Sequence, residues 1–368
     1  MVRPPLVATL LFGMFHGLFP HTAIAAPVAP TTAAQEFMAQ GWSAWQRGAF
    51  EDAVRAWLAA AQYYEQARQP RAQSDALTQL AHAYQALGQY RQAVQNLSSA
   101  LALAQKAGDR AQAATVLGGL GGSYFVTGSL DAAQQALQEG VRLAREISNM
   151  ALIAALLNDL GNVFTSQSKY AEALEAYGES VRVAAQQHDP ALAVRALTNA
   201  AMASMQQGQY EAARTRLDMA WAQMQDVPPS HDTAYSFINI GLAYASLSAS
   251  LSEDETQLTL RAAEALNAAA NLARTINDQR TLSYALGHLG GLYEEEQRYN
   301  EALQLTRQAL FAAQQVQAPE SLYRWQWQTG LLLKALGDRD AAIASYRQAV
   351  DTLQSFRQEM VLGAGSSR

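Results

Sequence analysis

Four histidines beyond residue 25 are the side chains best suited to metal binding or acid–base catalysis: His82, His188, His231 and His288. Zinc sites need ligands at close, fixed spacings, such as the two histidines of His-Glu-x-x-His on one helix face. None of the four has such a spacing, and the chain contains no cysteine. We therefore predict no metal site, no disulfide and no thiol chemistry. His188 and His231 lie next to predicted helix junctions, where they are expected at the surface or in helix caps.

Two other clusters resemble catalytic motifs in composition alone. The run Gly118-Gly119-Leu120-Gly121-Gly122 is as rich in glycine as a phosphate-binding loop, but no strand precedes it and no Lys-Ser/Thr follows it. The run Glu294-Glu295-Glu296 lies in a helical pattern, and consecutive helical residues point in different directions. Neither cluster can assemble a site, so we predict that the chain is not an enzyme and binds no cofactor.

The charge balance also excludes a class of partner. The chain has 26 Lys and Arg against 32 Asp and Glu, a net charge of −6, and its only lysines are Lys106, Lys169 and Lys334. A nucleic-acid surface needs clustered positive charge to displace counterions. We therefore predict no nucleic-acid partner. With 49% hydrophobic and 16% charged residues, the chain is expected to fold.

The N-terminus has the features of an export signal. Arg3 gives a positive start, residues 6–19 are apolar, and Ala23-Ile24-Ala25 is a small-x-small cleavage pattern. An uncleaved membrane anchor is the alternative, but this segment is shorter than the about 20 residues that span a bilayer. We predict a signal peptide at 1–25 and a linker at 26–33. The mature protein is then expected without a membrane span, in the periplasm of a Gram-negative bacterium or secreted from it.

The rest of the chain is one repeat. Alanine recurs every 40 residues from Ala53 to Ala213 and, after one step of 49 residues, again from Ala262 to Ala342. A Leu-Gly-x-x-aromatic motif, as at 120–124, recurs in variant or intact form ahead of the turns, and apolar residues recur every three or four positions on both sides of it. This spacing predicts two helices per repeat.

The helix starts carry the expected chemistry. Proline, which suits a first helical turn, occupies one shared repeat position: Pro70, Pro190 and Pro319. Side chains that can cap the orphan amides of a helix come one residue before that position: Asp109, Asn149, Asp189 and Asp278. We predict eight helix-turn-helix units, at about 34–69, 70–109, 110–149, 150–189, 190–229, 230–278, 279–318 and 319–360.

The combination of Leu-Gly-x-x-Tyr, a Gly-x-Tyr turn and Ala-x6-Ala resembles the tetratricopeptide repeat in a 40-residue form. This resemblance implies an all-α fold, a right-handed superhelical solenoid of about eight helix-turn-helix repeats. It also implies that the first helix of each repeat lines a concave groove.

Positions around the Leu-Gly motif supply the predicted peptide-binding groove. These residues are Asn158, Asn162, Arg195, Asn199, Tyr235, Asn239, Tyr284, His288 and Arg324, with Asp159 beside the first two. Asparagine amides can bond an extended peptide backbone, arginines can pair with carboxylates, and tyrosines add contact area. The set resembles the asparagine ladder with which kinesin light chain and related arrays hold peptides. In the alternative interpretation, Asn199 and Asn239 only bond neighbouring helices.

The step of 49 residues places nine extra residues between Tyr244 and Thr259. An extended loop and two lengthened helices are both possible, and we expect longer helices joined by an acidic turn at Glu253-Asp254-Glu255. The insertion could contact a partner or be neutral.

The last predicted helix has an apolar stripe at Ile343, Tyr346, Val350, Leu353, Phe356 and Met360, followed by a disordered tail at 361–368. Solenoids usually end on a helix with a polar outer face. The segment 322–360 resembles the last repeat of bacterial proteins that join tetratricopeptide repeats to a caspase-like CHAT domain. The chain has neither the cysteine nor the length for that domain, so its peptidase activity cannot be carried over.

The sequence supports two functions. The chain is predicted to be a non-enzymatic scaffold of the cell envelope that binds a protein or peptide in its groove. The alternative is the recognition half of a caspase-like peptidase, with a CHAT-type domain as its partner.

Overall fold

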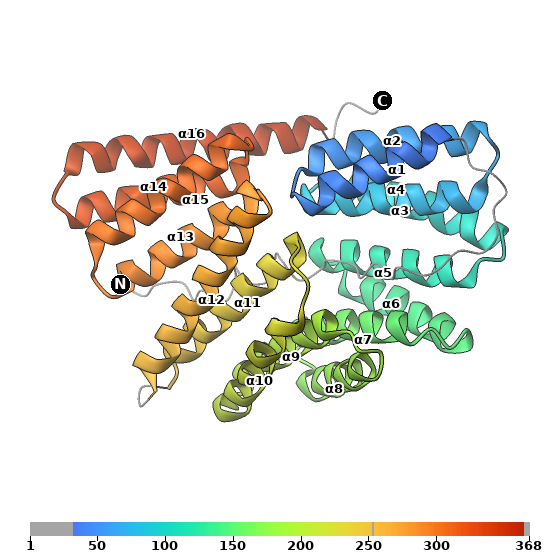
Figure 1. Cartoon of the computed structure of the whole chain (residues 1–368), viewed down its shortest axis with the longest axis horizontal. Helices are drawn as coiled ribbons and strands as arrows, with labels where there is room; N and C mark the ends of the chain where they lie inside the picture. The colour runs from blue at the N-terminus through green and yellow to red at the C-terminus, as the bar shows by residue number, and fades with distance from the viewer. Residues whose placement is uncertain (1–31, 252–253, 364–368) are drawn as a thin grey trace. The chain divides into compact units, whose positions relative to one another are not determined.

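The computed structural model describes residues 32–251 and 254–363, and over these ranges the chain forms sixteen α-helices, one 3-10 helix and no strand (Figure 1). The predicted all-α fold is confirmed. The predicted signal peptide and residues 26–31 of the predicted linker lie outside the described residues. The chain divides into two compact units, 1–227 (unit 1) and 228–368 (unit 2).

Unit 1 contains five antiparallel helix pairs. Its helices are α1 (Thr32–Gln46), α2 (Phe50–Gln66), α3 (Pro70–Ala86), α4 (Tyr90–Lys106), α5 (Arg110–Val126), α6 (Leu130–Glu146), α7 (Met150–Ser166), α8 (Tyr170–Gln186), α9 (Pro190–Gln206), α10 (Tyr210–Gln223) and the 3-10 helix η3 (Met224–Asp226). Each helix packs on the next one in the chain, and from α3 onward the first helices of successive pairs also touch, as α7 touches α5 and α9.

Unit 2 contains three more pairs. Its helices are α11 (His231–Ser248), α12 (Glu255–Thr275), α13 (Gln279–Glu295), α14 (Tyr299–Gln315), α15 (Pro319–Ala335) and α16 (Arg339–Gly363). The first helices α11, α13 and α15 contact one another in sequence, as they do in unit 1.

The predicted caps form. The carboxylate or amide oxygens of Asp109, Asn149, Asp189 and Asp278 each accept a hydrogen bond from the backbone N–H three residues on, at 3.0–3.1 Å. The three prolines occupy the first positions of α3, α9 and α15. The turns within pairs need a left-handed residue, which is usually glycine, as at Gly88 with φ of 73°.

The repeated small residues explain how the pairs pack. The alanines that recur every 40 residues in unit 1 are fully buried. The glycine of the Leu-Gly motif receives a large side chain from the second helix of its own pair. A Cβ added at Gly161 would lie 2.5 Å from the buried ring of Tyr177, and one at Gly121 would lie 2.5 Å from Leu137. Close approach therefore depends on the missing Cβ at these positions.

The nine extra residues are spread over several places. The start of α11 comes one residue later than a 40-residue step predicts, since 231 − 190 = 41. The next start, that of α13, comes eight residues later than expected, since 279 − 231 = 48. Helix α12, at 21 residues, is four longer than the usual 17, and α11 at 18 is one longer. The remaining residues lengthen the turn before Glu255, of which 252–253 lie outside the described residues.

The last helix presents apolar side chains to solvent. Tyr346 packs over Gly330 of α15, and its ring centroid lies 4.8 Å from that of Trp327. Ile343 and Val350 are 48% and 44% exposed, while Leu353 and Phe356 of the predicted stripe are partly buried. The side chain of Met360 lies outside the described ones. Helix α16 extends over the first three residues of the predicted tail, and residues 364–368 lie outside the described part.

Candidate functional site

The first helices place two repeat positions opposite each other. Counted from the helix start, Asp159 of α7 and His288 of α13 are tenth, while Arg195 of α9 and Arg324 of α15 are sixth. Helix α9 packs on α7 and α15 packs on α13. Across each of these contacts the sixth residue of one first helix acts electrostatically on the tenth of the preceding one, Arg195 on Asp159 and Arg324 on His288. We call these positions, together with their neighbours on the same helices, the inner-face residues of each unit.

In unit 1 the inner-face residues bond to one another. The Asn199 side chain donates from Nδ2 to Oδ1 of Asn158 at 2.9 Å, and Asn158 donates from its own Nδ2 to Oδ1 of Asp159 at 3.0 Å. All three side chains are buried. This network joins α7 to α9 and uses the groups that were predicted to bond a peptide. It matches the alternative interpretation of Asn199.

The Asp159 carboxylate interacts with a positive charge within unit 1. Burial raises the pKa of the Asp159 carboxyl to about 6, while the Arg195 guanidinium and the hydrogen bond from Asn158 act in the opposite direction. Arg195 therefore has an acidic neighbour on the preceding first helix.

Asn162 lies in the interior of the α7–α8 pair. Its Oδ1 accepts a hydrogen bond of 2.7 Å from the hydroxyl of Tyr177, a fully buried residue of α8. The Tyr177 hydroxyl also lies 3.2 Å from Oγ1 of Thr165. Asn162 is itself 2% exposed, so its contacts are those of a core residue.

Unit 2 brings together four of the predicted residues. Tyr235 of α11, Tyr284 and His288 of α13, and Arg324 of α15 form the unit-2 cluster, and all four side chains are partly buried. The rings of Tyr284 and His288 stack with centroids 6.3 Å apart. Both rings also meet Trp325 edge-on, His288 at 5.4 Å and Tyr284 at 6.2 Å.

Trp325 is the buried support of this cluster. Its Nε1 donates to Oγ of Ser283 at 2.9 Å, and its ring occupies the space over Gly287, where an added Cβ would lie 2.4 Å away. The rings of Tyr284 and His288 thus pack on Trp325, a side chain that is itself fixed by a hydrogen bond and by its packing over Gly287.

Arg324 is the only charged group of the unit-2 cluster at neutral pH. Burial and the Arg324 charge together lower the pKa of His288 to about 4, so the imidazole is neutral. Burial raises the pKa of Tyr235 to about 12 and also raises that of Tyr284, although Arg324 opposes both shifts. The two phenols are therefore neutral as well.

Among the described residues, Arg324 has no ion-pair partner. Its Nε is buried without a hydrogen-bond acceptor, and its guanidinium carbon lies 5.7 Å from the ring centroid of Tyr323. Glu320 at the start of α15 is already paired with Arg280. Asn239 of α11 is partly buried, and its amide makes no hydrogen bond to another described residue, unlike that of Asn199.

Two further findings concern metals and membranes. Over 32–251 and 254–363, no group of three His, Asp or Glu side chains has the arrangement of a metal site. None of the helices in these ranges combines the length and apolar character that a bilayer span requires.

Family models match several parts of the chain. Tetratricopeptide-repeat models match residues 71–146, 112–186, 158–223 and 327–352. A model described as anaphase-promoting complex subunit 5 matches residues 198–296. No curated protein matches the sequence significantly.

Solved structures are similar in fold. The signal-transduction ATPase with a tetratricopeptide repeat sensor from Pyrococcus horikoshii is 16% identical, with a TM-score of 0.55 over 92% of this chain and 52% of that one. A Rap protein complexed with competence and sporulation factor is 12% identical, with a TM-score of 0.48 over 90% and 100%. The kinesin light chain repeats of Podosopora anserina are 19% identical, with a TM-score of 0.43 over 52% and 94%. The family-model matches thus identify tetratricopeptide repeats within residues 71–223 and 327–352 of this all-α protein.

Proposed function

We propose that this protein is a non-enzymatic scaffold of the cell envelope that binds a peptide segment of a partner protein through the unit-2 cluster. Tetratricopeptide-repeat proteins bind protein or peptide partners, which supports this class of function. The observation that carries the proposal is the state of Arg324. The matching arginine of unit 1 has Asp159 as its neighbour, whereas Arg324 has neutral His288 at that position.

A carboxylate of the partner would complete this site. The planar guanidinium can bond both oxygens of a carboxylate at once, and a partly buried position strengthens the interaction. Tyr235 and Tyr284 offer hydroxyl donors and flat apolar faces, and the Asn239 amide can bond a peptide backbone. The site therefore suits an acidic side chain or a chain terminus presented on an extended segment.

The test is a selection of random dodecapeptides on the full mature chain, followed by affinity measurements on the peptides enriched most strongly. Arg324→Ala is expected to weaken binding of these peptides by about tenfold or more, because a charged hydrogen bond is worth about 1.5–3 kcal/mol. His288→Asp should weaken it similarly by giving Arg324 the acidic neighbour that Arg195 has. Affinities that neither substitution changes would rule out the unit-2 cluster.

The envelope location is a part of this proposal that rests on residues 1–25. A fusion of residues 1–40 to alkaline phosphatase, which is active only after export, should give activity in a Gram-negative host. The matched control replaces Leu10 and Leu11 in the apolar segment by arginine and should abolish the activity. An inactive parent fusion that is well expressed would count against export.

A second candidate function is the recognition half of a caspase-like peptidase. The observation that favours it is the cluster of exposed apolar side chains on the last helix pair: Trp327, Leu331, Ile343 and Val350. Such a face could dock a CHAT-type domain. The isolated chain should then self-associate, and Ile343→Ser with Val350→Ser should abolish the association. A chain that stays monomeric at high concentration would argue against this candidate.

A further inference from the structure

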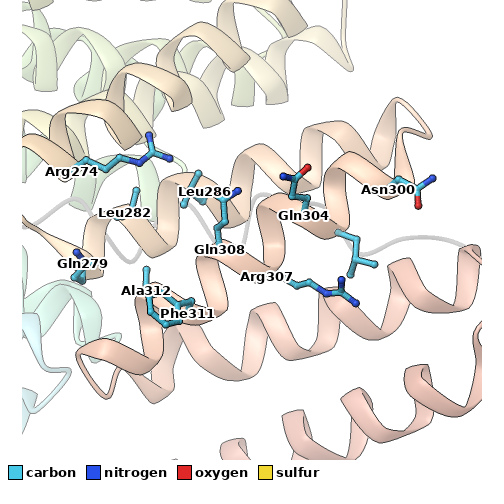
Figure 2. Close-up of a pocket in the computed structure, with 11 residues that line it drawn as sticks. Arg274, Gln279, Leu282, Leu286, Asn300, Gln304, Arg307, Gln308, Phe311 and Ala312 are labelled. Carbon is cyan, nitrogen blue, oxygen red and sulfur yellow. The ribbon is translucent and has the colours of Figure 1, made fainter.

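A second surface of unit 2 has the features of a peptide site. A cavity of about 720 Å³ lies between α12, α13 and α14, on side chains that the unit-2 cluster does not use (Figure 2). Its size is within the range of about 300–1,000 Å³ that is typical of ligand pockets. Its residues are Arg274 of α12, Gln279, Leu282 and Leu286 of α13, and Asn300, Leu303, Gln304, Arg307, Gln308, Phe311 and Ala312 of α14.

The floor of this cavity is apolar. Leu282, Leu286 and Leu303 are each less than a tenth exposed, so they belong to the packed interior and give the floor a fixed shape. Phe311 is 62% exposed and is the most exposed large apolar side chain among the described residues. Figure 2 shows Leu282 and Leu286 lying between Arg274 on one side and Phe311 on the other. An apolar side chain of a ligand inserted here would contact both the leucine floor and the Phe311 ring.

The charged groups of the cavity have one sign. Arg274 and Arg307 line it, and no Asp or Glu does. Arg274 donates a hydrogen bond to Asn271, and neither arginine has a carboxylate within 4 Å among the described residues. This positive groove belongs to a chain whose net charge is −6, so its sign is a local property. A negatively charged occupant is the one that it attracts.

The exposed side chains of α14 follow one face of the helix. Asn300, Gln304, Arg307 and Phe311 recur at intervals of three or four residues and thus form a continuous stripe. The eleven residue steps from Asn300 to Phe311 rise by about 16 Å along the helix, which matches about five residues of extended peptide. The side-chain amides of Gln304 and Gln308 make no hydrogen bond to another described residue, so these amides can bond a peptide backbone.

We propose that the groove formed by α12, α13 and α14 binds an extended acidic peptide segment of a partner protein, with one large apolar side chain on the Leu282–Leu286 floor and carboxylates on Arg274 and Arg307. This groove shares no residue with the unit-2 cluster, so either site can be correct without the other.

The test uses the same random dodecapeptide library on the full mature chain, with Arg274→Glu/Arg307→Glu as the groove variant. Arg347→Glu/Arg357→Glu is the matched control, because both residues are exposed on α16 and the change in net charge is the same. Apart from any peptides whose binding depends on Arg324, wild type should enrich a second set of peptides that combine Asp or Glu with a Phe, Leu or Trp. The groove variant should bind those peptides about tenfold or more weakly, and the control and Arg324→Ala should bind them like wild type.

Several results would overturn the proposal. Wild type could enrich no acidic peptide, or the groove variant could bind the enriched peptides unchanged. If Arg324→Ala removes binding and the groove variant does not, the unit-2 cluster is the site and the groove is not. A dimer in sedimentation velocity that the groove variant dissolves would assign the groove to a second copy of this chain instead.

Discussion

Replacement of Asp159 by asparagine is expected to stabilise unit 1 at neutral pH, although the carboxylate has Arg195 as a neighbour. Asp159 is only 9% exposed, and burial raises its pKa from the ordinary 3.8 to about 6 in spite of Arg195 and the hydrogen bond from Asn158. The raised pKa means that the charged form is disfavoured in the folded chain. The cost of removing the Asp159 carboxylate from water therefore outweighs its attraction to Arg195.

The magnitude follows from linkage. Between pH 4 and pH 6 the folded chain keeps a proton on Asp159 that the unfolded chain has already lost. The contribution of protonated Asp159 to the free energy of unfolding of wild type is therefore fully present below pH 4 and is lost as the pH rises. The loss reaches about 3 kcal/mol once Asp159 is ionised in both the folded and the unfolded chain. The asparagine variant cannot ionise, so its excess stability should be near zero at pH 4 and about 3 kcal/mol at pH 7.

The assay is urea unfolding of wild type and Asp159→Asn from pH 4 to pH 8. Hydrogen exchange of α7 locates the effect, because long repeat arrays need not unfold in one step. Asp131→Asn, on the exposed surface of α6, is the control and should show no such trend. If Asp159→Asn is less stable than wild type at pH 7, the attraction to Arg195 dominates and the reasoning is wrong.

Two further predictions concern packing and a buried ion pair. Gly161→Ala should destabilise unit 1 by about 1–3 kcal/mol because the added Cβ meets the ring of Tyr177. Gly178→Ala should stabilise the same pair of helices by up to about 1 kcal/mol, because an added Cβ there has nothing within 4 Å and alanine favours the helix. Thermal unfolding compares the two variants. Nδ1 of His231 lies 2.6 Å from Oδ2 of Asp278, and despite burial this contact raises the pKa of the histidine and lowers that of the aspartate. His231 and Asp278 are both charged only below the raised pKa of the histidine. Asp278→Asn should therefore lower the free energy of unfolding by about 3 kcal/mol at pH 6 and by less at pH 9. An equal loss at both pH values would contradict this account.

The sequence was sufficient to predict the features that depend on local chemistry. Capping side chains such as Asp109 act on the next few residues of their own helix, so a pattern in the chain is enough to find them. The glycines of the Leu-Gly motif are required by a contact that recurs from pair to pair, as between Gly121 and Leu137. Because these contacts repeat from pair to pair, they can be predicted from the sequence.

The direction of a polar side chain was harder to predict. An asparagine amide can bond a peptide or a neighbouring helix equally well, and the pattern alone left both open. Asn158 and Asn199 bond each other because each meets a partner of the right length on the adjacent helix, while Asn239 has none among the described residues. The α14 stripe lies on the second helix of its pair, so the first-helix positions of the repeat could not indicate it. The sequence shows Phe311 in a helix with several glutamines, but only the structure shows that this Phe is exposed.

The most informative missed signal is a spacing. Asp159 and Arg195 are 36 residues apart, since 195 − 159 = 36, and so are His288 and Arg324, since 324 − 288 = 36. In a 40-residue repeat this separation links the tenth residue of one first helix to the sixth of the next, two positions whose side chains interact electrostatically in both units. The arginine at this repeat position therefore has an acidic neighbour in unit 1, where Arg195 meets Asp159, and a neutral one in unit 2, where Arg324 meets His288. This difference between the two arginines is the reason for proposing a carboxylate ligand at Arg324 and not at Arg195.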